Sequence, residues 1–313
     1  MTIVSLFCGA GGLDLGLIQA GNRVVWANDN AHDAVETYRT NVGDHVVEDD
    51  VRNIDISLIP KADVVVGGFP CQGFSQANLL RDVDDSRNTL YRFFCKIIKA
   101  KKPRYFIAEN VKGILSLGGG AAIEKILSDF GRAGYLVETH LVNMADYGVP
   151  QHRQRVIIIG QRKDEGKEMK FRFPRPTHSK DGKGCLPQWR TIRDELDRFP
   201  DPDTPNDLPN HVYSAYKLAY RNFTGHRPTD PEKPCPTILA RGDGGGGVCA
   251  IPHYNGKRRL TIRESAAIQT FPDDFRFAGA MNSCYRQIGN AVPVLFARRL
   301  GEELVRLERE ELS

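Results

Sequence analysis

The chain of 313 residues lacks the features of a membrane, secreted or zinc-dependent protein. It has no apolar run near the roughly 18 residues that a membrane-spanning helix needs. Its first residues, MTIVSLF, show neither the basic start nor the cleavage site of a signal peptide. Its seven cysteines include no Cys-x-x-Cys pair, and no Cys/His cluster has the spacing of zinc ligands. We therefore expect a cytoplasmic protein with reduced thiols, no membrane contact and no metal.

The chain also lacks a strong excess of either charge. The 43 Lys and Arg residues stand against 39 Asp and Glu residues, and the net charge of +4 does not by itself indicate a nucleic-acid partner. Residues 171–259, however, hold 15 basic and 10 acidic side chains. The positive charge is therefore concentrated in one segment.

Strand and helix patterns alternate over the first 160 residues. Apolar runs predict strands over residues 2–7, 23–28, 46–48, 63–67, 105–109 and 155–160. Amphipathic patterns predict helices from about residue 13, over 31–41 and over 90–99. Strands separated by helices at these intervals indicate βαβ units, a largely parallel sheet and an α/β fold.

The sequence changes character after Gly160. Residues 171–257 hold most of the prolines and many glycines, so we expect a smaller, irregular domain with short strands. Helical patterns return at Thr261 and continue to the C-terminus. The chain therefore divides into three parts, 1–170, 171–257 and 258–313.

A glycine turn, residues 7–12 (FCGAGG), joins the first strand to the first helix. Glycines there let a ligand approach the backbone and the helix N-terminus. The dinucleotide fingerprint expects a third glycine where Asp14 stands, so a tight turn without a ligand is an alternative. Asp29 ends the second strand and Asp50 follows the third, where carboxylates can reach ribose hydroxyls and an adenine amine. Together these features predict an adenosine-containing cofactor.

A cysteine loop is the most specific signal. Cys71 lies in residues 67–75 (GGFPCQGFS), directly after the fourth strand, at the sheet edge where ligands bind. A thiolate there suits attack on an electron-poor carbon, although most cysteines are simply buried. Glu109 follows the next strand and could act as a general acid or cap a helix. Arg153 and Arg155 alternate by two, so they share a face of a strand or are solvated at its edge.

Taken together, these segments resemble the DNA (cytosine-5) methyltransferases. The resemblance rests on residues 7–12 (FCGAGG), 68–72 (GFPCQ), 109–111 (ENV), 151–155 (QHRQR), 263–264 (RE) and 287–292 (QIGNAV), in the family's order. It implies a Rossmann-like methyltransferase domain over 1–170 and a target-recognition domain over 171–257. Residues 258–313 would return to the catalytic domain.

The resemblance also implies a mechanism. Cys71 would add to carbon-6 of cytosine, and Glu109 would engage ring N3. Arg155 would hold the carbonyl oxygen of the base, and Arg153 would sit beside the thiolate or a phosphate. The methyl donor would be S-adenosylmethionine, and the cytosine would be flipped out of the duplex.

The same resemblance supplies a cofactor site. Its expected residues are Phe7, Gly9, Gly11, Asp29, Asp50, Val51, Pro70, Leu90, Asn290 and Val292. The family often has an acid where this chain has Ser5, and usually glutamate where it has Asp29.

Candidate DNA contacts lie in two regions. They are Ser75, Arg87, Arg227, Thr237 and Arg241. Residues 86–104 contain seven Lys and Arg and no acid, which suits neutralisation of phosphates or a solvated helix face. Thr237 and Arg241, at the end of the recognition stretch, could read base edges or bind phosphates only.

Three rival functions are weighed against this one. The missing third glycine disfavours a nicotinamide oxidoreductase, and the presence of thiol, acid and arginines disfavours an inactive DNA-binding regulator. Methylation of cytosine in RNA by the same chemistry stays open. Because the chain starts almost at its first motif, we expect a compact prokaryotic modification enzyme. The basic recognition segment favours double-stranded DNA over RNA as substrate. We also expect a monomer that lies near the nucleoid. A cognate restriction endonuclease is a candidate partner.

Overall fold

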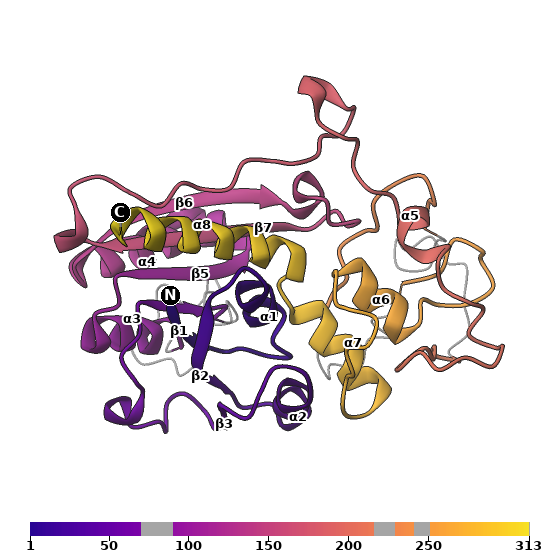
Figure 1. Cartoon of the computed structure of the whole chain (residues 1–313), viewed down its shortest axis with the longest axis horizontal. Coiled ribbons are helices and arrows are strands. Elements are labelled where there is room, and N and C mark those ends of the chain that lie inside the picture. The colour runs from indigo at the N-terminus through magenta and orange to yellow at the C-terminus, as the bar shows by residue number, and fades with distance from the viewer. Residues whose placement is uncertain (70–89, 216–228, 241–250, 313) are drawn as a thin grey trace.

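The computed structural model describes residues 1–69, 90–215, 229–240 and 251–312. Its strands are β1 (Thr2–Leu6), β2 (Arg23–Asp29), β3 (Val46–Glu48), β4 (Val64–Gly67), β5 (Tyr105–Val111), β6 (Tyr135–Asn143) and β7 (Gln154–Arg162). Its α-helices are α1 (Gly12–Gln19), α2 (His32–Asn41), α3 (Leu90–Lys101), α4 (Ala121–Arg132), α5 (Ile192–Leu196), α6 (Ile262–Ile268), α7 (Met281–Asn290) and α8 (Val294–Leu312). Figure 1 shows two lobes, one built on the sheet and one around α5, α6 and α7.

The seven strands form one sheet in the order β3-β2-β1-β4-β5-β7-β6. Neighbouring strands are parallel except at β7, which runs antiparallel to β5 and β6. The expected Rossmann-like α/β fold with a mostly parallel sheet is therefore confirmed. Because β7 is reversed, it begins where β5 ends, and Arg155 pairs with Val111. Side chains at the start of β7 thus reach the edge at which the parallel strands end.

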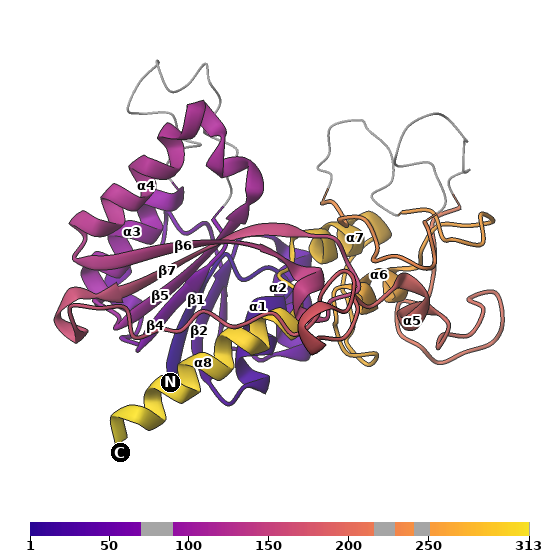
Figure 2. The ribbon, with the colours of Figure 1, turned by 90° about the horizontal axis from the view of Figure 1, so that it is seen from above.

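Apolar side chains cover both faces of the sheet. Val64 and Val66 face one core, which α1, α2 and α8 complete, whereas Val65 faces another core, which α3 and α4 complete. This alternation is the period-two pattern of a strand buried on both faces. Figure 2 shows α3 and α4 on one side of the sheet and α1 and α8 on the other. Within the described ranges, the helices are too short or too polar to span a bilayer.

The second lobe is built differently. Between residues 171 and 257, the described part of the chain forms α5, one short 3-10 turn and isolated bridges, but no strand. The expected short strands do not occur in this described part, because its prolines remove backbone donors and fix φ, so a ladder cannot extend.

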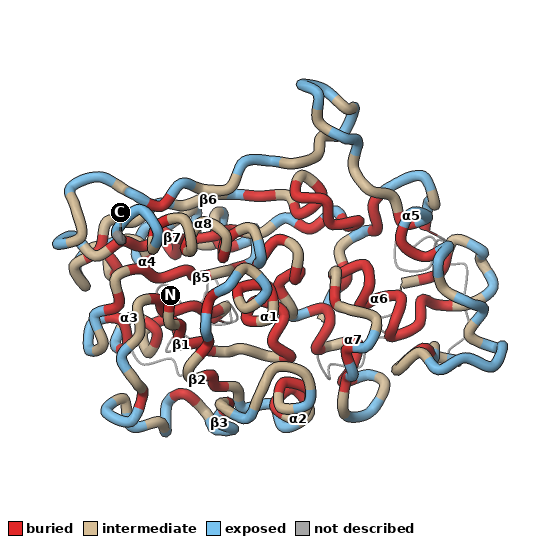
Figure 3. Tube along the Cα trace, in the orientation of Figure 1, coloured by how far each residue is buried: buried red, intermediate tan, exposed pale blue. Residues whose placement is uncertain are grey.

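A separate apolar core holds this lobe together. It joins α5 and residues 235–238 to α6 and α7, and Figure 3 shows the buried region around these two helices. The chain then returns to the sheet as α8, whose apolar residues join the core of the first lobe. The division at residues 170 and 257 stays a prediction.

Candidate active site

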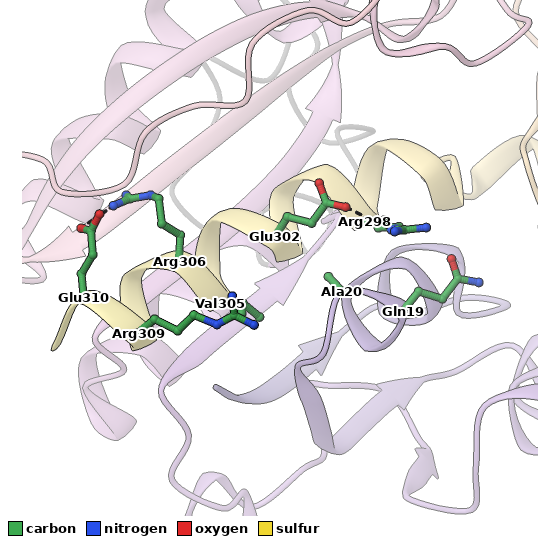
Figure 4. A pocket seen from close by; sticks show the side chains of 8 residues that line it. All are labelled: Gln19, Ala20, Arg298, Glu302, Val305, Arg306, Arg309 and Glu310. Atoms are coloured by element: carbon green, nitrogen blue, oxygen red, sulfur yellow. Dashed lines mark hydrogen bonds and ion pairs between the residues drawn. The ribbon is translucent and has the colours of Figure 1, made fainter. Parts of the chain in front are cut away.

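A cleft of about 1290 Å³ opens at the carboxyl edge of the sheet. The glycine turn, the ends of β2, β4 and β5, residues 238–240 and the end of α7 line it. Ligands of open α/β sheets bind at this edge. A second hollow, of about 400 Å³, lies between α1 and α8. Arg298 and Glu302 pair there, as do Arg306 and Glu310 (Figure 4), and the residues predicted to carry chemistry do not line it.

The glycine turn bends sharply between β1 and α1. Phe7, Gly9 and Gly11 have φ angles of 55°, 54° and 88°, a left-handed conformation that glycine adopts without strain. Phe7, Gly9 and Gly12 line the cleft. Gly11 instead packs against Tyr38 and so shapes the turn from behind.

Asp29 holds this turn in place. Its Oδ2 accepts a hydrogen bond from the Gly9 N–H at 2.8 Å, and its Oδ1 accepts one from the Ala31 N–H at 2.9 Å. Burial raises the pKa of this carboxyl. Asp29 also lines the cleft, and each carboxylate oxygen keeps a further lone pair for a ligand.

The other described cofactor candidates gather around the same cleft. It is lined by Asp50, Val51, Leu90, Asn290 and Val292. Asp50 pairs with Arg52 at 2.5 Å, and the hydrogen bond from that guanidinium lowers the pKa of the carboxyl. Pro70 lies outside the described residues.

Glu109 and Arg155 meet at the end of β5 and the start of β7. Arg155 Nε lies 2.8 Å from Glu109 Oε1, and each side chain is 12% exposed. The contact is an ion pair and not an aligned hydrogen bond, since Nε finds no hydrogen-bond partner within the described ranges. Asn110 Nδ2 donates to the Phe69 carbonyl at 2.9 Å, which ties the end of β5 to the segment that leads to Cys71. Cys71 itself lies outside the described residues.

Arg153 also lines the cleft, but main-chain carbonyls occupy its guanidinium. Nη1 donates to the Ile238 carbonyl at 3.1 Å, and Nη2 donates to the Gly289 and Ala291 carbonyls at 3.0 Å each. The side chain is 1% exposed, and burial lowers its pKa to about 9, so it stays charged at neutral pH. Arg153 is therefore not a solvated residue at a strand edge.

The model for C-5 cytosine-specific DNA methylases matches residues 1–306. The chain belongs to this family. Type II methyltransferase M.NgoFVII of Neisseria gonorrhoeae is 40% identical over 320 residues, which cover 93% of this chain and 83% of that protein. Type II methyltransferase M.FnuDI of Fusobacterium nucleatum is 35% identical over 99% of this chain and 96% of its own.

Solved structures agree with the family. A prophage-encoded protein of E. coli, described as a DNA modification methyltransferase, superposes with a TM-score of 0.79 at 25% identity over 99% of both chains. The Dnmt2 methyltransferase of S. pombe reaches a TM-score of 0.69 at 17% identity over 100% of this chain and 99% of its own, which shows a shared fold alone. The protein is thus a DNA (cytosine-5) methyltransferase with a Rossmann-like catalytic fold.

Several buried polar residues of this methyltransferase were not predicted as parts of the site from the sequence. Gln151 and Gln269 are fully buried between the lobes. Asp14 is also fully buried and accepts hydrogen bonds from the Ser5 and Tyr38 hydroxyls at 2.7 Å each. Burial raises the pKa of Asp14 to about 6. Gln151 begins the QHRQR motif, which was a usable signal, whereas nothing local marks Gln269.

The DNA-contact candidates of the methyltransferase fall mostly outside the structure. Ser75, Arg87, Arg227 and Arg241 are not among the described residues. Thr237 is described, and its hydroxyl donates to the His152 carbonyl at 2.5 Å, so it joins the recognition segment to the catalytic lobe. Whether it also contacts DNA stays a prediction.

One group of metal-ligand type occurs in the described part of the methyltransferase. His32, Glu36 and Glu48 lie close together at the surface. Arg39 already pairs with both glutamates, at 2.7 Å and 3.9 Å, which opposes a cation there. The expectation that no metal is needed stays a prediction.

Proposed function

We propose that this methyltransferase transfers a methyl group from S-adenosylmethionine to carbon-5 of a cytosine that is flipped out of double-stranded DNA. The observation that carries the proposal is the Glu109–Arg155 ion pair at the rim of the cofactor-type cleft. A carboxyl and a guanidinium held side by side offer two donors, the protonated carboxyl for ring N3 and the guanidinium for the adjacent carbonyl oxygen of cytosine.

The residues of the cleft fit S-adenosylmethionine. Carboxylates at Asp29 and Asp50 suit ribose hydroxyls and an adenine amine, and Phe7, Val51 and Val292 offer apolar walls. Such a mixture of apolar surface and few polar groups is typical of small-molecule sites. Gly9, Leu90 and Asn290, with Pro70 from the sequence, would complete the site, and Gly11 would support the turn from behind. When bound, S-adenosylmethionine supplies an electrophilic methyl group.

The chemistry on the base is assigned to three side chains. The Cys71 thiolate forms a bond to carbon-6, which moves the ring electrons toward carbon-5 while Glu109 hydrogen-bonds N3. Arg155 donates to the carbonyl oxygen and stabilises the charge that develops there. Once carbon-5 carries the methyl group, it loses its proton to water, and the bond between carbon-6 and Cys71 breaks to release the thiolate. The electron pair of the lost C–H bond restores the double bond of the ring.

The biological setting is proposed from the relatives. Their names as Type II methyltransferases support a role in DNA modification beside a restriction endonuclease of the same specificity. The basic segment 171–259 supports duplex DNA as substrate, because it can neutralise phosphates. We propose that the enzyme acts as a monomer, with sequence choice in residues 171–257.

A mechanism-based trap tests the proposal. In the presence of S-adenosylmethionine, DNA fragments that carry 5-fluorocytosine should form an adduct with the wild type that resists denaturant, because the methylated carbon-5 then carries fluorine and has no proton to lose. Cys71→Ala should form no adduct but should still bind DNA, since phosphate contacts supply most of the affinity.

Two results would contradict this assignment. An adduct that persists in Cys71→Ala would show that another residue is the nucleophile. An adduct with 5-fluorocytosine RNA and none with DNA would favour the RNA alternative.

A further inference from the structure

Two glutamines form a buried amide bridge between the lobes. Gln151 Nε2 donates to Gln269 Oε1 at 2.9 Å, and both side chains are 0% exposed. Gln151 Oε1 accepts the Ile238 N–H at 3.0 Å. Gln269 Nε2 donates to the Ile288 carbonyl at 2.7 Å and reaches the Ala291 carbonyl at 3.3 Å. The bridge therefore connects the loop before β7, the end of the recognition stretch and the end of α7.

Arg153 connects the same segments a second time. Its guanidinium holds the Ile238 carbonyl on one side and the Gly289 and Ala291 carbonyls on the other. Both main-chain groups of Ile238 are thus fixed, the N–H by Gln151 and the carbonyl by Arg153. Charge-assisted bonds in a buried site are stronger than neutral ones and define geometry more tightly.

Residues 238–240 and the end of α7 pack too closely to slide past each other. A Cβ atom on Gly289 would lie 2.5 Å from the Ala240 nitrogen and 2.6 Å from the Leu239 carbonyl carbon. The recognition stretch is also joined to the loop before β7, because His152 N–H donates to the Cys235 carbonyl at 2.8 Å. A movement of residues 238–240 must therefore displace the end of α7, or break this packing.

These segments carry different parts of the proposed function. Residues 238–240 belong to the proposed recognition domain and line the cleft, whereas Asn290 and Val292 line the cleft as proposed cofactor residues. Arg155, two residues after Arg153, holds Glu109. Target recognition, cofactor binding and base chemistry thus meet at one buried cluster.

We propose that Gln151, Arg153 and Gln269 form a clamp that couples binding of the target sequence to affinity for S-adenosylmethionine. Arg153 is then a positioning residue that does not touch the cytosine. When duplex DNA binds residues 171–257, residues 238–240 become fixed in position. Through the hydrogen bonds of the clamp, Asn290 and Val292 then become fixed as well. By linkage, the cofactor must strengthen DNA binding by the same factor. The inference rests on the proposed function.

Arg263 provides a matched control. It is 0% exposed, and it also donates to three main-chain carbonyls, those of Pro209, Pro272 and Phe275. Burial lowers its pKa to about 10, as it lowers that of Arg153. Arg263 does not line the cleft, and all three of its carbonyls belong to the second lobe or its connections. Arg263→Lys should therefore cost stability without affecting the coupling.

The experiment measures the dissociation constant of S-adenosylmethionine by calorimetry, with and without a duplex that carries the methylated site found by bisulfite sequencing. A duplex with that site scrambled is the negative control. For the wild type, the cognate duplex should tighten cofactor binding about tenfold or more, within the range of known couplings. In Arg153→Lys, the ratio of the cofactor dissociation constants without and with the cognate duplex should fall to about one. In Arg263→Lys, this ratio should stay at the wild-type value. Gln269→Met is a second variant, in case Arg153→Lys does not fold.

Three results would overturn the clamp. They are a wild type without coupling, an Arg153→Lys enzyme with the full factor, and an equal loss of coupling in Arg263→Lys. The readout is a binding constant, whereas the proposed function is tested by the methylation that identifies the site, so these results are distinct from failure of the proposed function. A wild type that binds no S-adenosylmethionine at all would contradict the proposed function itself.

Discussion

Replacement of Asp29 by alanine should separate the cofactor site from the stability of the fold. The carboxylate accepts the N–H groups of Gly9 and Ala31, so it shapes the glycine turn and presents its remaining lone pairs to the cleft. The Asp29→Ala variant should bind S-adenosylmethionine much more weakly. Its affinity for DNA without cofactor should stay nearly unchanged, because the phosphate contacts are not altered.

The magnitude follows from the bonds that are lost. Each hydrogen bond from a ribose hydroxyl to a carboxylate contributes about 1.5–3 kcal/mol, less what water recovers. A net loss of about 2–4 kcal/mol corresponds to an affinity about 30- to 700-fold weaker. Stability should change less, because the N–H groups of Gly9 and Ala31 lose a partner while a costly buried charge is removed.

A matched acid lies at the opposite edge of the sheet. Asp63 accepts hydrogen bonds from the Thr2 N–H at 2.7 Å and from the Thr2 hydroxyl at 2.6 Å, but it does not line the cleft. Asp63→Ala should lower the denaturation midpoint and leave cofactor affinity intact. Calorimetry that shows unchanged cofactor affinity in Asp29→Ala, or equal losses in both variants, would refute the reasoning.

Two further predictions concern a buried acid and sequence choice. Burial raises the pKa of Asp14 from an ordinary 3.8 to about 6. As the pH rises from about 4 through 6, this carboxyl ionises inside the fold, and the free energy of unfolding of the wild type should fall by up to about 3 kcal/mol. Urea denaturation of Asp14→Asn should show no such fall in the free energy of unfolding. A difference in that free energy between wild type and Asp14→Asn that stays constant from pH 4 to pH 8 would contradict the prediction. Arg241→Ala should weaken methylation of the cognate site by about 1–3 kcal/mol and reduce discrimination against single-base variants if Arg241 reads a base edge. Kinetics at two salt concentrations check this, because loss of a phosphate contact would weaken all sequences equally and flatten the salt slope by about one.

Much of the sheet could be predicted from the sequence, because its central strands are continuous apolar runs. β6 was missed, since Glu138, Thr139 and His140 interrupt its apolar pattern. The reversal of β7 was also missed, because a buried strand has the same pattern in either direction. α4 was overlooked although Ile123, Ile126 and Phe130 have regular helical spacing.

The residues of the candidate site also fall into those that the sequence revealed and those that it did not. Glu109 and Arg155 were found because each stands in a short motif at the end or start of a strand, and the structure brings them to 2.8 Å. The role of Arg153 as a clamp could not be read from its motif, since its three carbonyl partners lie 85 to 138 residues away in the sequence. Gln269 was hidden for the same reason, because burial of a polar side chain depends on segments that meet only in the folded chain.

Bisulfite sequencing of DNA from cells that express the protein tests the central claim most directly. We expect cytosines within one short sequence to be protected in cells with the wild type and unprotected in cells with Cys71→Ala. Mass spectrometry of the digested DNA should identify the product as 5-methylcytosine. Unmodified DNA in cells that contain folded wild-type protein, or the same protection with Cys71→Ala, would contradict the account.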